Sequence, residues 1–295
     1  DRLADLLGLD QYLHNNPPPS IPHILATTTT DCQLATIQPD SRPDSRLNSH
    51  RDPTTMSWSR REIPGGAIEL FEPSTAAPSI GLLFLPGHSG TTLNNNTTWT
   101  HALEHAGLRA ACPVAGSGWW LDDSDLIADR TPLEWLHQVV AGWLQTEWDT
   151  RPAGLAVSGV SLGAQAALGL AYRHARDYPV VAAVAPAIDF HKLHGLGLPL
   201  DDWYNSPEDA RQQTVPLHIN PLNWPVHQML CCDSDDHEWF DGVQRLTSKL
   251  HSSGIPVTTL FESHQLGHCW DYFNIAANHV IDFVTQRLQQ VHKSL

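Results

Sequence analysis

Short apolar runs alternate with helix-like stretches from residue 58 to the end of the chain. Strand-like runs are expected at residues 58–63, 80–85, 109–112, 154–157, 180–184, 227–231 and 257–261. Helices are expected at 98–106, 162–172 and 239–250, and apolar residues form one helical face at 136–144 and another at 280–291. This alternation predicts an α/β protein with a mainly parallel central sheet that is flanked by helices on both faces.

Residues 1–55 differ from this pattern. They hold seven of the 22 prolines and a run of four threonines, and no period of a strand or helix persists in them. We expect a poorly ordered N-terminal extension at 1–55 and a compact domain at 56–295. Residues 186–225 are expected to form an irregular excursion near the active site, with one short helix that is capped by Ser206.

The composition narrows the classes of partner. The formal charge is −15, and nine carboxylates between residues 201 and 241 face only one basic side chain, Arg211. A polyanion such as nucleic acid would be repelled there. No apolar run is long enough to span a bilayer, and no export signal is visible. Five cysteines without a CxxC pair favour free thiols. We therefore expect a soluble, cytoplasmic protein, while the sequence leaves its oligomeric state open.

A Gly-x-Ser-x-Gly motif lies between an expected strand and an Ala-rich helix. It reads Gly159-Val160-Ser161-Leu162-Gly163. Glycines two residues either side of the serine allow a tight turn that exposes the hydroxyl group. The alternative is a serine in an ordinary glycine-containing turn, but the strand-turn-helix context favours Ser161 as a catalytic nucleophile.

A serine nucleophile needs a base and an acid. Where the serine stands on such a strand-turn-helix, the acid comes after it in the chain and the histidine comes after the acid. Histidine 268 lies in the loop after the last expected strand and beside Gly267, which favours His268 over the competing His264. The acid is expected among Asp233, Asp235 and Asp236, which follow the strand at 227–231. The same carboxylates could bind a metal, although no calcium-loop spacing is present.

The oxyanion of an acyl-transfer reaction needs backbone N–H donors. One expected donor is Leu162, which follows the nucleophile. The second is expected from the loop Pro86-Gly87-His88-Ser89-Gly90, with the N–H of His88 as the best candidate. A plain tight turn is the alternative for this loop.

Four segments together resemble the esterase branch of the α/β-hydrolases, which includes S-formylglutathione hydrolases and several carbohydrate esterases. They are the Pro86 loop, the stretch Gly116-Ser117-Gly118-Trp119-Trp120-Leu121-Asp122-Asp123, the Ser161 turn and Gly267-His268-Cys269-Trp270-Asp271-Tyr272. The likeness covers roughly residues 80–295. The chain departs from the family where Pro86-Gly87 replaces a common His-Gly.

The resemblance implies an α/β-hydrolase fold and Asp236 as the acid. It also implies that Trp119, Trp120, Asp122 and Trp270 lie beside the active site, where the alternative for the tryptophans is an aromatic packing cluster. The expected function is hydrolysis of a small-molecule carboxylic ester, which could be an acylated sugar, by a Ser-His-Asp mechanism without metal or organic cofactor. A thioesterase of the S-formylglutathione hydrolase type and a non-catalytic binding module are the alternatives.

Overall fold

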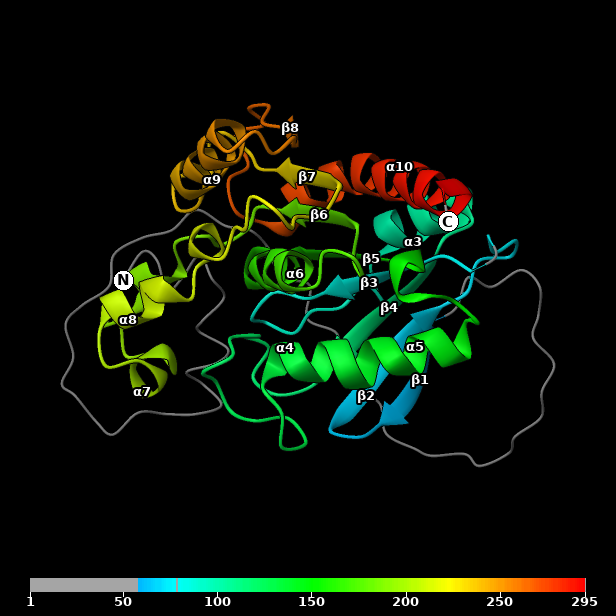
Figure 1. Cartoon of the computed structure of the whole chain (residues 1–295), viewed down its shortest axis with the longest axis horizontal. Helices are drawn as coiled ribbons and strands as arrows, with labels where there is room; N and C mark the ends of the chain where they lie inside the picture. Colours follow the sequence, from blue (N-terminus) through cyan, green and yellow to red (C-terminus); the bar gives the residue numbers. More distant parts are fainter. Residues whose placement is uncertain (1–57, 78, 295) are drawn as a thin grey trace. The chain divides into compact units, whose positions relative to one another are not determined.

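The computed structural model describes residues 58–77 and 79–294 of the chain. The expectation of an N-terminal extension at 1–55 lies outside the described residues. Within them, eight strands form one sheet in the order β1-β2-β4-β3-β5-β6-β7-β8 (Figure 1). Their bounds are β1 Trp58–Ile63, β2 Gly66–Phe71, β3 Gly81–Leu85, β4 Arg109–Val114, β5 Leu155–Val160, β6 Val180–Val184, β7 His227–Cys231 and β8 Thr258–Leu260.

The sheet is parallel from β4 to β8 and antiparallel at the other edge. Strand β2 pairs antiparallel with both β1 and β4, whereas β3 pairs parallel with β4 and β5. The remaining neighbours, β5 to β8, are all parallel. The expected mainly parallel sheet is therefore present, and every expected strand is found within a few residues. Strand β2, which completes the antiparallel edge, was not predicted.

Helices cover both faces of the sheet. Their bounds are α3 Thr97–Ala106, α4 Pro132–Trp135, α5 Ala141–Glu147, α6 Ser161–Arg173, α7 Leu200–Trp203, α8 Pro207–Gln212, α9 Phe240–Ser252 and α10 Trp270–Ser294. Helix α10 packs on α3 and on strands β5 to β7, while α6 packs on β3, β5 and β6 and contacts α4. A π-helical turn, Leu136–Val140, joins α4 to α5.

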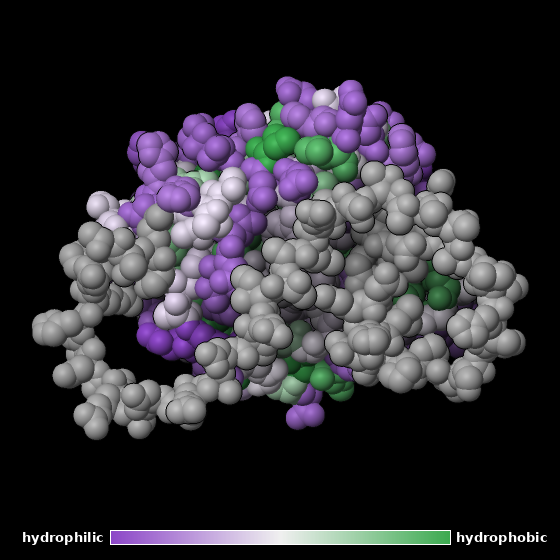
Figure 2. All heavy atoms as spheres, turned by 180° about the vertical axis from the view of Figure 1, so that it is seen from behind, coloured by the Kyte–Doolittle hydropathy of each residue, from purple (hydrophilic) through white to green (hydrophobic). Residues whose placement is uncertain are grey.

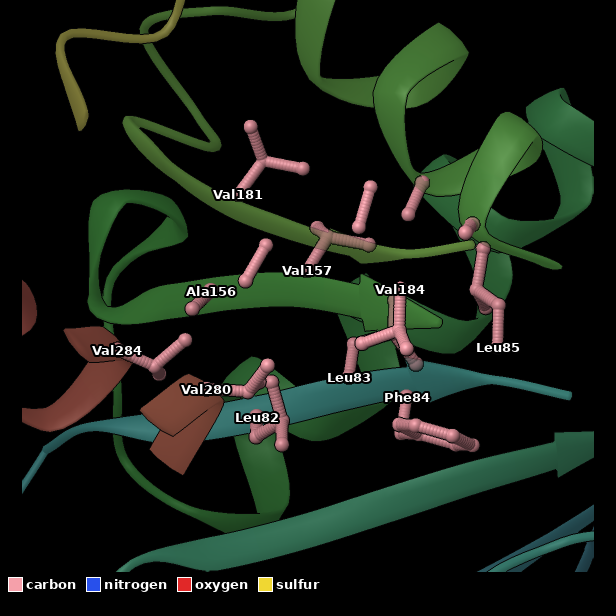
Figure 3. Close-up of a cluster of buried hydrophobic side chains, with 14 of the residues drawn as sticks. Leu82, Leu83, Phe84, Leu85, Ala156, Val157, Val181, Val184, Val280 and Val284 are labelled. Carbon is pink, nitrogen blue, oxygen red and sulfur yellow. The ribbon is translucent and has the colours of Figure 1, made fainter. Parts of the chain in front are cut away.

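The core lies between the sheet and these helices. Strand β3 is buried along its whole length, as its continuous apolar run predicts. Figure 3 shows Val280 and Val284 of α10 directed toward Leu82 and Ala156 on strands β3 and β5. The central parallel strands β3, β5 and β6 are continuous apolar or small-residue runs because helices remove both of their faces from water.

The excursion at 186–225 contains more structure than the sequence predicts. Helix α8 begins after Ser206, whose side chain accepts the N–H of Asp209, as expected. The short helix α7 and two 3-10 turns, Phe190–Leu193 and Val215–Leu217, were not predicted. Such four-residue and three-residue turns are too short to produce a periodic pattern.

One face of the molecule is seen in the space-filling view of Figure 2. Seen from the side opposite to Figure 1, its hydrophobic residues form small separate patches among hydrophilic ones (Figure 2). In the part of the chain that the structure describes, none of the helices has the length and apolar character needed to cross a membrane.

Candidate active site

Ser161 stands at a sharp turn between β5 and α6. It is the first residue of α6 and has a φ of 57°, in the left-handed region that residues other than glycine rarely adopt. A Cβ at Gly163 would lie 2.2 Å from the carbonyl oxygen of Leu85, and one at Gly159 would lie 2.6 Å from the same atom. Only glycine fits at these two positions, so both glycines of the motif are explained by the close approach of β3.

Three side chains from distant parts of the chain form a hydrogen-bonded relay. The Nε2 atom of His268 lies 2.9 Å from the Oγ of Ser161. The Nδ1 atom of the same ring lies 2.9 Å from the Oδ2 of Asp236. The side chain of His268 is 6% exposed and that of Asp236 is 1% exposed. The relay is therefore shielded from water, which strengthens its electrostatic interactions.

The three aspartates that the sequence did not distinguish have different hydrogen-bond partners in the structure. Asp236 reaches His268, and its Oδ1 accepts the N–H groups of Glu238 and Trp239 before α9 begins. Asp235 instead contacts Ser263 and the N–H of Gln265 on the outer side of the loop. The alignment of one carboxylate with the imidazole depends on this turn.

Asp233 is fully buried and organises the loop that carries His268. Its two oxygens accept the N–H groups of Asp235, His264, Leu266 and Gly267 at 2.9 to 3.1 Å. Burial raises the pKa of this carboxyl, but the four backbone hydrogen bonds outweigh burial and hold the pKa below its usual range. Asp233 therefore stays ionised and fixes the position of the histidine loop.

Aromatic rings hold the His268 imidazole in place. The ring of Phe273 meets it edge-on at a centroid distance of 5.2 Å, and the ring of Trp239 lies 6.1 Å away. Neither residue was predicted from the sequence. Both belong to the starts of helices that follow the loops of the site, and ordinary core residues at such positions carry no distinguishing pattern. His264, the competing histidine, faces Tyr272 at 5.7 Å instead of Ser161.

The Pro86 loop passes directly beside the serine. A Cβ on Gly87 would lie 3.3 Å from the Cβ of Ser161, so the loop comes close to the serine at Gly87, the residue before His88. Leu162 lies in the first turn of α6, where backbone N–H groups have no partner within the helix. The two expected oxyanion donors, Leu162 and His88, are therefore neighbours of Ser161 in space.

The ring of His88 is uncharged at neutral pH. Burial, together with repulsion from a charge on His268, lowers the pKa of His88 to about 4. A neutral ring does not oppose the positive charge that His268 would gain on taking a proton. His88 also lies 6.0 Å from the ring of Trp119, between centroids.

The four residues expected beside the site have different surroundings. Trp119 is buried against His88 and the ring of Trp203, at 5.7 Å from the latter. The buried indole N–H of Trp120 donates to the carbonyl of Pro86 at 2.9 Å. Trp270 is half-buried at the start of α10 and packs on Phe273, 5.5 Å away.

Asp122 has structural partners. Its carboxylate forms an ion pair with Arg173 and accepts the N–H of Leu133 at 3.3 Å. These contacts connect the loop after β4 to helices α4 and α6. They account for Asp122 without a substrate, and the predicted role in a substrate pocket remains a prediction.

One group of possible metal ligands occurs among the described residues. It consists of His137, His174 and Asp177, whose ligand atoms lie within 4.8 Å of one another. The two imidazole rings stack nearly parallel, at 11° and 3.7 Å between centroids. A metal ion lies in the plane of each imidazole that binds it, so one ion cannot serve both rings in this arrangement. The group lies apart from Ser161, beyond the far end of α6.

A large cavity that the described residues line lies away from the relay. It has a volume of about 780 Å³ and includes Pro179 and His227, which stand at the beginnings of β6 and β7. Ser161 follows the opposite end of β5, which is parallel to β6. The cavity and Ser161 therefore lie at opposite ends of the parallel strands. The size of the cavity gives no reason to place a substrate of Ser161 there.

A family described as "Putative esterase" matches residues 128–260 of the chain. This stretch includes Ser161 and Asp236 and ends before His268. The matched range is shorter than residues 80–295, the range over which the motifs predicted a resemblance. A search among curated proteins found no match. The family match supports a hydrolase function for the chain.

Solved structures with the same fold include several esterases. An S-formylglutathione hydrolase from Agrobacterium tumefaciens has a TM-score of 0.63 and 13% identity, covering 79% of this chain and 100% of its own. A ferulic acid esterase has a TM-score of 0.62 and 13% identity, covering 78% and 99%. The S-formylglutathione hydrolase from Staphylococcus aureus has a TM-score of 0.61 and 12% identity, covering 79% and 100%.

At these identities the likeness establishes the fold and not the substrate. The resemblance predicted from four motifs is confirmed by the fold and by the match to the esterase family. The chain is thus an α/β-hydrolase-fold protein that resembles the family of esterases.

Proposed function

We propose that this protein is a serine esterase that cleaves a carboxylic ester through an acyl-enzyme on Ser161. The observation that carries the proposal is the relay from Ser161 Oγ to His268 Nε2 and from His268 Nδ1 to Asp236 Oδ2, with both distances at 2.9 Å. This geometry is within hydrogen-bond reach for proton transfer in a nucleophile–base pair.

The proposed reaction has two steps. In the first, the Oγ of Ser161 attacks the ester carbonyl while His268 takes the hydroxyl proton, and His268 then gives that proton to the leaving alcohol. In the second, water attacks the acyl-enzyme while His268 takes a proton from the water, and His268 then returns that proton to the Oγ of Ser161 as the carboxylic acid leaves. Asp236 orients the imidazole and stabilises the imidazolium in both steps.

Oxyanion stabilisation is assigned to two backbone N–H groups, those of Leu162 and His88. The first lies at the N-terminus of α6, where the helix dipole also favours a negative charge. The second belongs to the loop in which Gly87 lies so near Ser161 that an added Cβ would be 3.3 Å from the Cβ of the serine. Donors that are already in place cost no reorganisation during the reaction.

Covalent labelling tests the nucleophile directly. A fluorophosphonate probe should modify the full chain at Ser161, and Ser161→Ala should remove the label while leaving the unfolding transition unchanged. A short-chain aryl ester should be hydrolysed by the original protein and not by this variant. An unlabelled Ser161 in a folded protein, or a variant that keeps its esterase activity, would be incompatible with the proposal.

A matched pair of variants tests the base, and a single substitution tests the acid. His268→Ala should abolish ester hydrolysis, whereas His264→Ala should retain most of it, because only the first ring lies at Ser161. Asp236→Asn should lower kcat by about 10⁴, the loss expected when the acid of a triad is neutralised. Equal losses in His264→Ala and His268→Ala would contradict the assignment of the base.

A further inference from the structure

A polar pocket lies between the loop that leads into α3 and the beginning of α10. Its volume is about 270 Å³, close to the lower end of ligand pockets, at about 300 Å³. The residues that line it, called here the Thr/Asn pocket, are Thr91, Thr92, Asn95, Asn96, Thr97, Thr98, Trp270 and Asn274. No part of the mechanism proposed above uses them.

The Thr/Asn pocket adjoins the candidate active site on two sides. On one side, Trp270 packs on Phe273 at 5.5 Å, and Phe273 packs on the catalytic ring of His268 at 5.2 Å. On the other, Thr91 follows the oxyanion loop closely and its Oγ1 lies 3.0 Å from the Oγ of Ser89. Contacts through the rings of His268 and Phe273 thus connect Ser161 to Trp270 in the wall of the pocket.

The chemistry of the lining residues indicates the class of ligand. Seven of the eight carry a hydroxyl or an amide group, the eighth is a tryptophan, and none carries a formal charge. A carboxylate or phosphate would need a basic side chain to replace its hydration, and the chain as a whole carries a charge of −15. Hydroxyl and amide groups both donate and accept hydrogen bonds, and an indole face packs against C–H groups. This combination matches a sugar ring.

The pocket is held in shape by bonds between its own walls. The Nδ2 of Asn96 donates to the Oδ1 of Asn274 at 2.8 Å, which joins the α3 side to the α10 side. The Oδ1 of Asn96 accepts the N–H of Trp99 as the cap of α3. A ligand would find these groups in place, which lowers the entropic cost of binding.

Other polar groups in the pocket have no hydrogen-bond partner among the described residues and could bind a ligand. Asn95, Thr97 and Thr98 are exposed, and their side chains form no hydrogen bond with any described residue. The amide nitrogen of Asn274 likewise has no partner among the described residues, because only its oxygen contacts Asn96. These four residues line the pocket together with Trp270 and supply hydrogen-bond donors and acceptors there.

We propose that the Thr/Asn pocket binds a neutral sugar ring of the ester substrate. The inference rests on the proposed esterase function for its place in the reaction, since the pocket would hold the carbohydrate part while the ester bond lies at Ser161. The lack of basic lining residues makes the pocket a poor site for the two carboxylates of a glutathione thioester.

Binding without catalysis is the direct test. Ser161→Ala, in the full chain, would be titrated with xylotriose, cellotriose and maltotriose and observed by saturation-transfer difference NMR and calorimetry. At least one neutral trisaccharide should bind saturably at millimolar concentration or below. Glutathione and a trimer of galacturonic acid, at the same concentrations, should bind at least tenfold more weakly.

Variants locate the binding. In the Ser161→Ala background, Trp270→Ala should weaken the trisaccharide at least tenfold. Trp224→Ala should not, because this partly buried tryptophan lines the separate 780 Å³ cavity. Thr98→Val keeps the shape of an exposed side chain and removes only its hydroxyl group, so it should fold normally and weaken binding about threefold to tenfold, the effect of one net hydrogen bond.

The outcomes separate this inference from the proposed function. Absence of saturable binding by all three trisaccharides, equal binding of the charged probes, or unchanged affinity in Trp270→Ala and Thr98→Val would overturn the inference. None of these results depends on Ser161 as a nucleophile. Failure of fluorophosphonate labelling, with trisaccharide binding intact, would instead overturn the esterase assignment and leave a carbohydrate-binding pocket.

Discussion

The hydrogen bond from Trp120 to Pro86 fixes the loop that is proposed to stabilise the oxyanion. The indole N–H lies in a buried position, 2.9 Å from the carbonyl oxygen of the residue before Gly87. Trp120 has a φ of 56°, in the left-handed region that residues other than glycine rarely adopt. Trp120→Phe removes the donor and keeps most of the aromatic packing.

The cost to stability can be worked out from two contributions. A buried carbonyl that loses its donor costs about 1–3 kcal/mol. The smaller ring leaves a void of roughly 40 Å³, which at about 24 cal/mol per Å³ adds about 1 kcal/mol. A total of about 2–4 kcal/mol corresponds to a fall in Tm of roughly 5–15 °C for a domain of this size.

The effect on catalysis follows from the position of the loop. Removal of one oxyanion donor lowers kcat by about 10²–10³ in serine proteases. Trp120→Phe loosens the loop without removing the donor, so the loss of kcat should be smaller. We expect kcat on a short aryl ester to fall about 10-fold to 100-fold. The value of KM should change by less than about threefold, because the interaction is stronger in the transition state than in the bound substrate.

Trp99→Phe is the matched control. Trp99 is also fully buried, on α3, and its indole nitrogen has no hydrogen-bond partner among the described residues. The substitution therefore creates a similar void without removing a bond at the site. Differential scanning calorimetry and steady-state kinetics would compare the two variants. If Trp120→Phe lowers Tm but leaves kcat within twofold of the original value, the bond stabilises the fold without positioning the oxyanion loop.

Two further predictions concern stability. Gly163→Ala should destabilise the protein by about 1–3 kcal/mol or more, because the new Cβ would lie within 2.3 Å of the carbonyl oxygens of Leu85 and Pro86. Gly142→Ala, in helix α5 with open space around it, should instead stabilise by about 0.8–1 kcal/mol in urea unfolding; equal effects would contradict the packing argument. Asp233→Asn should cost about 1.5–3 kcal/mol at pH 7, because it removes the charge that accepts four backbone N–H groups. Since the folded pKa of Asp233 is depressed, its stabilisation is complete above the unfolded pKa of about 3.9 and is lost as pH falls through the folded pKa. The stability difference between the two proteins should thus be constant near neutral pH and shrink below about pH 4, and a difference that grows on acidification would show that the sign is wrong.

Local patterns in the sequence were sufficient for the architecture. Strands β3 and β5 are buried on both faces and β3 appears in the sequence as a continuous apolar run, and the glycines around Ser161 reflect close backbone contacts that only glycine permits. Strand β2 was missed because it lies at the antiparallel edge and follows the tight turn at Gly65, where a six-residue segment gives a weak signal.

The choice of acid shows where sequence reasoning ends. Asp233, Asp235 and Asp236 lie within four positions and have the same chemistry, so nothing local distinguishes them. Their assignments depend on the fold of the loop at 262–267, whose backbone N–H groups bind Asp233 and Asp235 and leave Asp236 to face His268. That loop is about 30 residues away in the chain, and only folding brings it into contact.

The sequence by itself determined the α/β class, the strand-turn-helix that carries Ser161 and the order of the candidate triad, because each depends on residues close together in the chain. Tertiary structure decided which carboxylate meets His268, which ring orients it and which tryptophan holds the oxyanion loop. It also brought Trp270 beside a row of threonines and asparagines some 170 residues earlier in the chain. Such contacts between distant segments arise from the packing of helices on the sheet, and no local pattern records them.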